Sequence, residues 1–560
     1  MLLPPTDSKR HLYEALTRHN YFPNQKEGAR ELPPCFSTTS FTPEIVELLV
    51  KIDEPNKQAP VNRIALGYDQ VIYSLTRHNN VPRMLALPHP KAYALLVKNI
   101  YENWDDIEHI ANNDHSVIKP DQHQDGRMLV MNYEGLCDRT ERALLNGFGM
   151  RFVVHTDISS CFHSIYTHSI PWAVQGFEEA KEKLAKNSPK HWSDELDKFQ
   201  RKAKRNETQG IAIGPGTSTI VVELVLSAVD RTLKNAGYKF HRYIDDYVCY
   251  CESHEKAQSF IQALGLALRK FKLDINLHKT HIAELPEPMS DQWVTELSAA
   301  QPLGFVGKDG IREITDNEIV TFLDTAVRLN KSTPDGSVVK YAVSYLLRLA
   351  SEKTIKQLLD YSIHLAWHYP VLIPMLDQML SSDAILPEDY KNQLNAIALE
   401  NAKKNRSDGM AWSLYYLNKY GLNCTVEVYS EVYKTRDCMA LMCLYANGAS
   451  EQHIIDFAMT LLCKPAYERD QYWVLLYQIY KDGKIPDPYK DGVFELLKRY
   501  EVDFMAGENY QTKAQSYCDY INNPFIDVDE TQPLTFDTWI KKHSQEVEIG
   551  VEQPKEQENA

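Results

Sequence analysis

The feature that most constrains this chain is a pair of adjacent aspartates, Asp245 and Asp246, set between two apolar segments. Residues 238–252 read YKFHRYIDDYVCYCE, with aromatic and β-branched residues on both sides of the pair. This composition favours two strands joined by a tight turn. The segment RFVVHTD at 151–157 predicts another short buried strand, which ends at Asp157. We therefore expect strands that present carboxylates from rigid supports.

Carboxylates held in this way suit two-metal phosphoryl transfer. Two divalent cations, ~3.5–4 Å apart, activate a hydroxyl nucleophile and stabilise the leaving pyrophosphate. The hard ion Mg²⁺ prefers carboxylate oxygens and retains water and phosphate ligands. The alternatives are a solvated Asp-Asp turn and, for Asp157, a helix N-cap. A Gln-Gly…Gly-Pro turn at 209–215 accompanies the aspartates, and the combination favours catalysis.

Three motifs stand in the order found in reverse transcriptases. Tyr243–Asp246 (YIDD) resembles the YxDD box, and His155–Phe162 (HTDISSCF) resembles the first palm motif. Gln209–Pro215 (QGIAIGP) resembles the second palm motif. Further segments resemble bacterial abortive-infection and defence-associated reverse transcriptases (AbiK-like), namely IYTHSIPW at 165–172, RNETQG at 205–210 and the run 214–218. The motifs cover most of residues 60–285, and the rest of the chain resembles the group only in architecture.

From about residue 335 the sequence pattern is almost wholly helical. Three segments, 411–421, 439–448 and 472–483, are apolar, carry tyrosines and end in glycine, which accepts the positive φ of a helix C-terminus. The glycine spacing is irregular, so a degenerate α-solenoid and an irregular helical bundle both fit. The resemblance favours the first of these, because the group carries a HEAT-like helical region in place of a conventional thumb.

The expected fold class is therefore α+β. Right-hand polymerase fingers and palm, an antiparallel sheet with helices, are followed by an all-α HEAT-like helical-repeat domain. The expected divisions are an N-terminal region with fingers (1–150), a palm with the active site (151–300), a linker (301–334), the helical-repeat domain (335–530) and an acidic flexible tail (531–560).

The resemblance implies roles for individual residues. Asp157, Asp245 and Asp246 correspond to the catalytic metal ligands, with the carbonyl of Ile158 as an additional ligand for two Mg²⁺ ions that Mn²⁺ can replace. Lys279, in NLHKT at 276–280, corresponds to the catalytic lysine that protonates the departing pyrophosphate. That short match is unspecific.

A second set of residues is expected to bind the incoming nucleotide. Phe162 occupies the steric-gate position, where a flat ring excludes a ribose 2′ hydroxyl, so the implied substrate is a dNTP; the alternative is ordinary core packing. Gln209 and Gly210 match the turn that lies against the nucleotide. Lys119 and Arg127 flank a polar loop and resemble the fingers cations that clamp the triphosphate; the alternative is ordinary surface charge.

Other polar clusters have simpler interpretations. The basic run at 201–205 is either a solvated helix face or a contact to template or product. The chain has 19 histidines but no HExxH or comparable metal spacing, and we interpret them as structural. The ten cysteines form no CxxC pair, which favours a reducing compartment.

The charge of −15 at first argues against a nucleic-acid protein, because phosphate contacts need Lys and Arg. The charge is unevenly distributed. Residues 1–300 hold 35 Lys+Arg and 38 Asp+Glu, a net of −3, so the remaining 260 residues carry −12. The proposed polymerase half is thus nearly neutral, and bound Mg²⁺ would offset its aspartates. The acidity of the second half suits a basic partner.

The implied function is a reverse-transcriptase-type DNA polymerase in antiphage defence (abortive infection). A 3′ hydroxyl, or a tyrosine hydroxyl in protein-primed and template-independent synthesis, attacks a dNTP and yields single-stranded DNA; the priming residue is unknown. One alternative copies a dedicated noncoding RNA template. Another is a non-enzymatic helical scaffold that binds a phage or host protein. With no signal-like N-terminus and no apolar stretch of spanning length, we expect a cytoplasmic protein without membrane contact. The resemblance implies a homo-oligomer.

Overall fold

The computed structural model describes most of the chain up to residue 505. The described ranges are 5–23, 30–52, 66–77, 80–123, 125–129, 135–186, 189–306, 312–334, 337–448 and 451–505. The acidic tail expected at 531–560 lies outside the described residues, as does the part of the helical range beyond residue 505. Within the described ranges, no helix is both long and apolar enough to cross a membrane.

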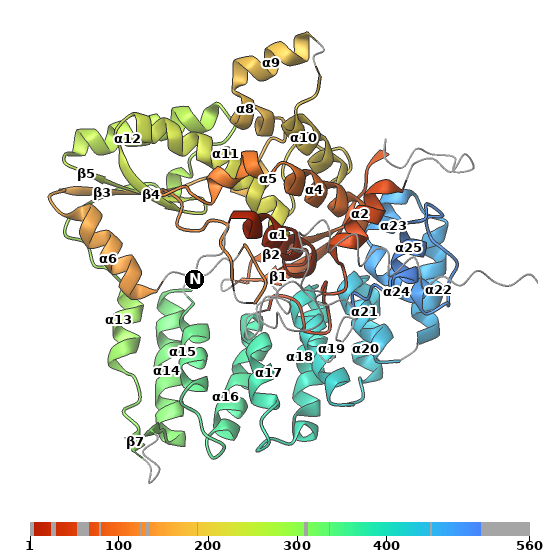
Figure 1. Ribbon diagram of the computed structural model, residues 1–560. Helices are drawn as coiled ribbons and strands as arrows, with labels where there is room; N and C mark the ends of the chain where they lie inside the picture. Colours follow the sequence, from red (N-terminus) through yellow and green to blue (C-terminus); the bar gives the residue numbers. More distant parts are fainter. Residues whose placement is uncertain are drawn as a thin grey trace, which may run out of the picture.

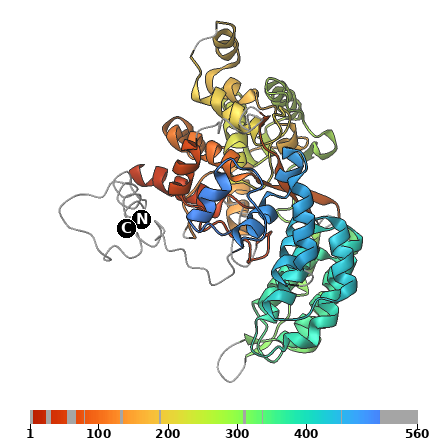
Figure 2. The ribbon, with the colours of Figure 1, turned by 90° about the vertical axis from the view of Figure 1, so that its right-hand side faces the viewer.

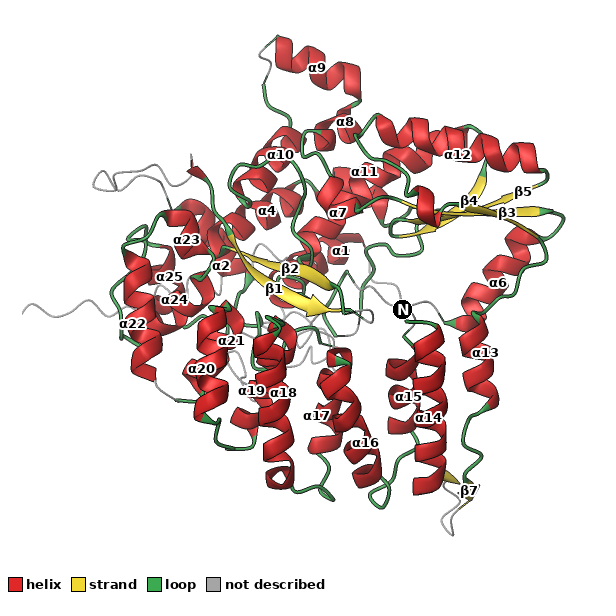
Figure 3. Ribbon diagram, turned by 180° about the vertical axis from the view of Figure 1, so that it is seen from behind, coloured by secondary structure: helices red, strands yellow, loops and turns green. Residues whose placement is uncertain are grey.

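A four-stranded antiparallel sheet carries the three aspartates, at the left of Figure 1. Its strands run in the spatial order β4-β5-β3-β6. Side chains alternate between the two faces along each strand. Helices α11 and α12 lie on one face of the sheet and α6 on the other (Figures 1 and 3). The bounds are β3 (Phe152–Asp157), β4 (Lys239–Tyr243), β5 (Asp246–Cys251), β6 (His281–Glu284), α6 (Leu136–Gly147), α11 (Gly216–Asn235) and α12 (His254–Arg269).

This sheet confirms the expected antiparallel arrangement of strands and helices. The strand expected at 151–157 is β3, and the expected hairpin around the aspartate pair is β4 and β5. Between β3 and the hairpin lie short helices and the long, mostly buried α11. The connecting helices are α7 (Cys161–Ser164), α8 (Ser169–Gln175), α9 (Phe177–Ala185) and α10 (Trp192–Lys202), and a single 3₁₀ turn, Leu277–Lys279, precedes β6.

The N-terminal region packs a small helical layer against a two-stranded antiparallel hairpin. The longest helix of this region, α4, buries nine of its residues. Helix α4 begins at a proline, where the missing N–H costs no hydrogen bond. The bounds are α1 (Pro5–Glu14), a π-helical turn (Ala15–His19), α2 (Pro43–Lys51), β1 (Gln70–Thr76), β2 (Pro82–Pro88), α4 (Pro90–Glu102), α5 (Trp104–Ile107) and a 3₁₀ turn (Glu108–Ile110).

The C-terminal region is a curved row of helices that stand side by side beneath the rest of the chain (Figures 1 and 3). Three of them end at left-handed glycines, Gly421, Gly448 and Gly483, as the sequence pattern predicted. The bounds are α13 (Gln292–Ala299), α14 (Asp316–Ser332), α15 (Val338–Leu347), α16 (Ile355–His368), α17 (Leu376–Leu380), α18 (Lys391–Lys403), α19 (Ser407–Lys419), α20 (Val426–Thr435), α21 (Cys438–Ala446), α22 (Glu451–Leu462), α23 (Ala466–Asp470), α24 (Trp473–Lys481) and α25 (Val493–Arg499), with 3₁₀ turns at Pro370–Met375 and Pro387–Tyr390.

The range 301–334, expected as a linker, holds regular structure. A small hairpin, β7 (Phe305–Val306) with β8 (Arg312–Glu313), is followed by α14, which joins the row of helices. Helix α14 starts at a capping box, in which Thr315 bonds the backbone of Glu318 and Glu318 bonds the backbone of Thr315. That reciprocal pair satisfies two orphan donors and fixes the helix start.

The row of helices completes the exposed edge of β1. The Ser74 N–H donates to Ser407 Oγ at 2.9 Å, and the Thr76 N–H donates to Asp408 Oδ2 at 2.7 Å. Both acceptors lie at the start of α19. Successive outward N–H groups of an edge strand need partners, and here the N-terminus of a helix 332 residues later supplies them.

An aromatic core ties the two regions together further along the hairpin. Tyr21 stacks on Tyr93 with ring centroids 3.9 Å apart, and Trp473 meets Phe504 edge-on at 5.1 Å. Trp473 Nε1 donates to the Leu87 carbonyl of β2 at 3.0 Å. Figure 2, turned by 90°, also shows the last helices beside the N-terminal ones. The β1–β2 hairpin is therefore packed between the N-terminal helices and the C-terminal helices.

Candidate active site

The three aspartates converge because of strand register. Asp157, the last residue of β3, lies directly opposite Asp246, the first residue of β5. Asp245 precedes Asp246 in the turn, and its carbonyl accepts a hydrogen bond from the Ile158 N–H at 3.2 Å. Ile244 adopts a left-handed φ of 59°, rare for a β-branched residue, which tightens the turn. The sequence thus brings three carboxylates to one end of the sheet.

Burial and mutual repulsion favour the protonated forms in this cluster. Burial, then the charges of Asp157 and Asp246, raise the pKa of Asp245 to about 6. Burial and the charge of Asp157 also raise the pKa of Asp246. Like charges in a poorly solvated site resist ionisation unless a cation balances them.

Lys279 supplies positive charge to the cluster. Its Nζ lies 2.6 Å from Asp157 Oδ2, and this bond raises the pKa of Lys279. Asn276 holds the same strand end, since its N–H donates to the Asp157 carbonyl at 2.7 Å and its side-chain amide to Oδ2 at 3.3 Å. The segment that carries Lys279 is therefore bonded to the carboxylate it neutralises.

A buried ionic network supports the aspartate turn from the sheet face that α11 covers. Arg242, in β4, is fully buried and forms ion pairs with Glu223 and Asp230 of α11. It also donates to the Ile244 carbonyl of the turn at 3.0 Å. Tyr247 adds a hydroxyl bond to Asp230 at 2.9 Å. Arg242 can be buried because both Glu223 and Asp230 pair with its positive charge.

The Gln-Gly turn lies against the helix that follows Asp157. The Gly210 N–H donates to the Ile165 carbonyl at 2.7 Å, and the Ile211 N–H donates to the Phe162 carbonyl at 2.9 Å. The Gln209 side chain donates to the Ser164 carbonyl at 3.0 Å. Gly210 has a φ of 78°, and a Cβ there would lie 3.0 Å from the His163 carbonyl oxygen, so glycine is required. Phe162 is buried in the same unit.

The two expected fingers cations have different surroundings. The segment before Lys119 adds to the edge of β4, where the Val117 N–H donates to the Arg242 carbonyl at 2.9 Å. Lys119 makes no ion pair with any described residue. The guanidinium of Arg127 is buried, and its Nη2 lies 2.6 Å from Asp125 Oδ2. Asp125 thus orients Arg127 within its own loop.

The basic cluster at 201–205 makes contacts within the chain. Arg201 pairs with Asp197 at 3.2 Å, and Lys204 donates to the Gln209 carbonyl at 2.9 Å. Arg205 pairs with Asp69 at 2.6 Å. These bonds favour a structural role for the cluster over a contact to template or product.

Sequence reasoning missed two features of this region. The first is the network of Arg242 with Glu223 and Asp230; two carboxylates seven residues apart in an otherwise apolar helix signal a shared buried partner. The second is a cluster of His155, His281 and Glu287, whose ligand atoms lie within 4.8 Å of one another. No local spacing indicates that cluster, because strand pairing brings its residues together.

Comparison with protein families identifies the polymerase region. Residues 102–323 match the family described as reverse transcriptase (RNA-dependent DNA polymerase). The match spans the four-stranded sheet, the three aspartates and the Gln-Gly turn. The chain contains a reverse transcriptase domain. This domain is a nucleotidyltransferase of the RNA-directed DNA polymerase class. No curated protein matches the sequence.

Solved structures similar to this chain include telomerases of two Candida species. An apo telomerase from Candida tropicalis truncated from its C-terminal domain has 12% identity and a TM-score of 0.28, with 40% of this chain covering 51% of that one. The fuller apo telomerase of that species has the same identity and score, with coverages of 73% and 69%. A Candida albicans telomerase in complex with a TWJ fragment of telomeric RNA has 13% identity and a TM-score of 0.26, with coverages of 68% and 67%. The chain spans about half the length of the first of these structures. Scores at this level establish neither a shared architecture nor a shared partner.

Proposed function

We propose that this chain synthesises DNA by adding dNTPs at the carboxylate cluster of its reverse transcriptase domain. The observation that carries the proposal is the register of β3 and β5, which sets Asp157 opposite Asp246 with Asp245 in the adjoining turn. Three carboxylates at one strand end are destabilising unless cations balance them. Lys279 alone cannot offset three negative charges.

The donor set fits divalent metal ions. The raised pKa values of Asp245 and Asp246 reflect unbalanced charge, which divalent cations would relieve. Asp157, Asp245 and Asp246 would hold two Mg²⁺ ions, with Mn²⁺ as a substitute and the Ile158 carbonyl as a further oxygen ligand. Such ions activate an attacking hydroxyl and stabilise the charge of the leaving pyrophosphate.

The remaining residues of the domain position the nucleotide. Lys279 donates a proton toward the leaving pyrophosphate and, between turnovers, forms an ion pair with Asp157. The Phe162 ring excludes a ribose 2′ hydroxyl. Gln209 and Gly210, fixed against the helix that bears Phe162, form the surface on which the base and sugar lie. Lys119 and Arg127 contribute charge toward the triphosphate, which requires Arg127 to exchange Asp125 for phosphate.

The test is incorporation of labelled dNTPs by the purified full chain in Mg²⁺. We expect incorporation by the wild type and none by Asp245→Ala/Asp246→Ala. A matched control removes another adjacent pair of carboxylates, Glu178→Ala/Glu179→Ala on the exposed helix α9, and should retain activity. Equal activity in wild type and the aspartate variant, across varied templates, would overturn the proposal.

We further propose that the activity serves antiphage defence by abortive infection, with cytoplasmic homo-oligomers that make single-stranded DNA. The resemblance of the motifs to defence-associated enzymes supports this role. Phage plating on cells that carry the wild type or the Asp245→Ala/Asp246→Ala variant tests it. Protection that persists without the aspartates would favour the scaffold alternative over synthesis.

Initiation on a protein hydroxyl is a separable part of the proposal. The chain has 32 tyrosines, and a tyrosine hydroxyl can replace a primer 3′ hydroxyl as nucleophile. Label that survives denaturing electrophoresis and is released by protease would support protein priming. Label only in free oligonucleotide would contradict it. Sequencing of RNA that co-purifies with the chain identifies the alternative in which a dedicated RNA is copied.

A further inference from the structure

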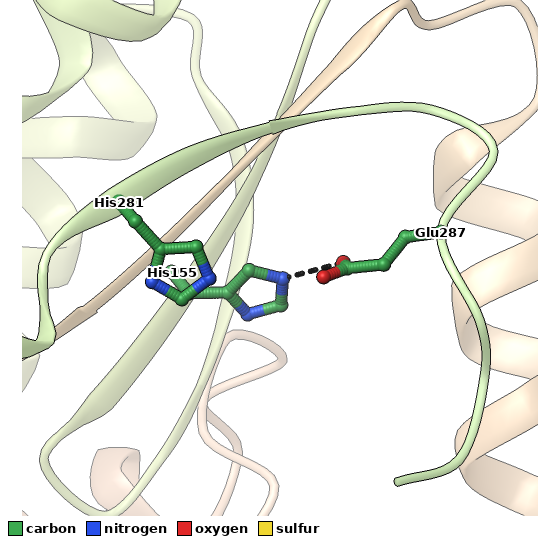
Figure 4. A group of neighbouring side chains, drawn as sticks. All are labelled: His155, His281 and Glu287. Atoms are coloured by element: carbon green, nitrogen blue, oxygen red, sulfur yellow. Dashed lines mark hydrogen bonds and ion pairs between the residues drawn. The ribbon is translucent and has the colours of Figure 1, made fainter. Parts of the chain in front are cut away.

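A histidine–glutamate cluster lies on the same sheet as the aspartates. His155 on β3 pairs in register with His281 on β6, and both side chains lie on the sheet face that carries Asp157. Glu287 follows β6 on the chain that leaves the sheet toward α13. Figure 4 shows His281 beside His155, and Glu287 approaching His155 from the neighbouring loop. Three segments of the chain thus meet at one point.

The three side chains of the cluster lie close together, but only His155 and Glu287 are joined by a polar contact. His155 Nε2 lies 2.8 Å from Glu287 Oε2. The two imidazole rings lie nearly parallel, with centroids 5.0 Å apart and planes inclined by 21°. All three ligand atoms lie within 4.8 Å of one another. The His281 imidazole makes no hydrogen bond to any described residue, so its ring nitrogens are open to solvent or a ligand.

We propose that His155, His281 and Glu287 bind one transition-metal ion of the Zn²⁺ class, at a site separate from the aspartates. Two imidazole nitrogens and one carboxylate oxygen are a donor set that Zn²⁺ adopts, whereas Mg²⁺ prefers oxygen ligands. Tetrahedral Zn²⁺ with bonds of ~2.0–2.1 Å separates its ligand atoms by about 3.4 Å. Ligand atoms already within 4.8 Å reach that spacing by small side-chain rotations.

The partial exposure of the cluster leaves a path for the ion. The side chains of His155 and Glu287 are 32% and 35% exposed, and His281 is exposed. Three protein ligands leave the fourth position of a tetrahedral ion open to water. Strand pairing already fixes the backbone positions of His155 and His281, two of the three ligands.

The bound ion would fasten the segment that carries Lys279. His281 follows Lys279 by two residues, and Thr280 between them bonds Thr156 of β3 at 2.7 Å between hydroxyl oxygens. A metal ion held by both His281 and His155 would add a further attachment of this segment to β3. The ion would thereby stiffen the strand end at which Lys279 contacts Asp157.

The experiment is Co²⁺ titration of metal-stripped full-length protein in excess Mg²⁺, followed by visible absorption. We expect one Co²⁺ per chain, with the absorption of a tetrahedral or five-coordinate ion. His281→Ala and Glu287→Gln should each weaken Co²⁺ binding by at least about tenfold. Loss of a residue that only hydrogen-bonds a metal ligand already costs about that much, and loss of a ligand itself should cost more. The matched control is His278→Ala, an exposed histidine three residues from His281 that lies outside the cluster.

A second arm separates this site from the aspartates. Binding should persist in Asp245→Ala/Asp246→Ala, and Zn²⁺ should raise the unfolding temperature of the wild type but not of His281→Ala, because a ligand stabilises only the state it binds. Equal Co²⁺ affinity in the wild type and His281→Ala, or loss of binding only in the aspartate variant, would overturn the proposal. So would a wild type that binds no Co²⁺ in Mg²⁺. The result does not depend on whether the chain polymerises DNA.

Discussion

Arg242 contacts Glu223 through both of its terminal nitrogens, with Nη1–Oε1 and Nη2–Oε2 distances of 2.7 Å. Both side chains are almost completely buried, at 0% and 1% exposure. A planar, bidentate pair of this kind is strong and directional. Because Arg242 also bonds the Ile244 carbonyl, the pair links α11 to the turn that carries Asp245.

Glu223→Gln should destabilise the fold. It leaves Arg242 with one charge partner, and removal of one member of a buried pair costs about 3–5 kcal/mol. We expect a lower denaturant midpoint, measured by circular dichroism, together with reduced dNTP incorporation by the protein that remains folded. The comparison is Lys186→Ala, which removes an exposed pair with Glu182 and should cost less than about 1 kcal/mol. Similar midpoints for both variants would contradict the buried network.

Asp245→Asn should stabilise the metal-free chain at neutral pH while it abolishes incorporation. The folded pKa of Asp245, about 6, lies above its ordinary value of 3.8. A raised pKa contributes stability below pH 3.8, and that stability is lost as pH rises toward 6. Wild type therefore carries a penalty above pH 6, on the order of 3 kcal/mol, that the amide lacks. Thermal unfolding as a function of pH in a chelator measures the difference, which should shrink as the pH falls from 6 and vanish below 3.8.

Lys279→Met should reduce incorporation and raise the Mg²⁺ requirement. A general acid contributes about 10²–10⁴-fold to rate. The positive charge of Lys279 also lowers the pKa of Asp245 and Asp246. Its loss leaves these carboxylates more protonated, so half-maximal activity should need more Mg²⁺. The control is Lys270→Met, an exposed lysine at the end of α12. A slower variant with an unchanged Mg²⁺ dependence would contradict the proposal that the charge of Lys279 helps the aspartates to bind Mg²⁺.

Phe162→Ala distinguishes a steric gate from simple core packing. The ring is 7% exposed and belongs to the hydrophobic core, so truncation costs about 3–5 kcal/mol in either case. If the ring also excludes the 2′ hydroxyl, the ratio of kcat/KM for dNTP over rNTP should fall. Steady-state incorporation of matched dNTP and rNTP measures this ratio. A destabilised variant with unchanged selectivity would assign Phe162 to the core alone.

Asp408→Ala should weaken the junction between the N-terminal hairpin and the row of helices. Asp408 is buried and accepts hydrogen bonds from both the N–H and the hydroxyl of Thr76, at 2.7 and 2.8 Å. The variant leaves the buried Thr76 N–H unpaired, which costs about 1–3 kcal/mol. Limited proteolysis should then cut the hairpin region faster. Asp383→Ala, at an exposed position, should leave the cleavage rate unchanged.

Local patterns were sufficient to predict the parts of the site that lie close in sequence. The aromatic and β-branched residues around Asp245 and before Asp157 predicted β3, β4 and β5, because such residues favour strands. The Gln-Gly turn could be predicted in the same way, because glycine marks positions of positive φ, and Gly210 has one.

Long-range contacts were not predictable in the same way. The pairing of His155 with His281 depends on the register of strands separated by more than 100 residues, which no local pattern encodes. Arg127 illustrates a different limit, because its position beside a polar loop does not reveal that Asp125 binds it. We expected a linker where α14 forms. The helix starts at a capping box of Thr315 and Glu318, and such polar residues are equally common in loops.

The edge of β1 has a consequence for how this protein is made. The acceptors for Ser74 and Thr76 are synthesised more than 300 residues after the hairpin itself. During translation the hairpin therefore leaves the ribosome with bare backbone donors, a state that invites mispairing with other chains. A fragment that ends before α19 would keep that edge permanently open. Helix α19 therefore completes the N-terminal hairpin, which cannot satisfy its edge donors in this way until the C-terminal region has been made.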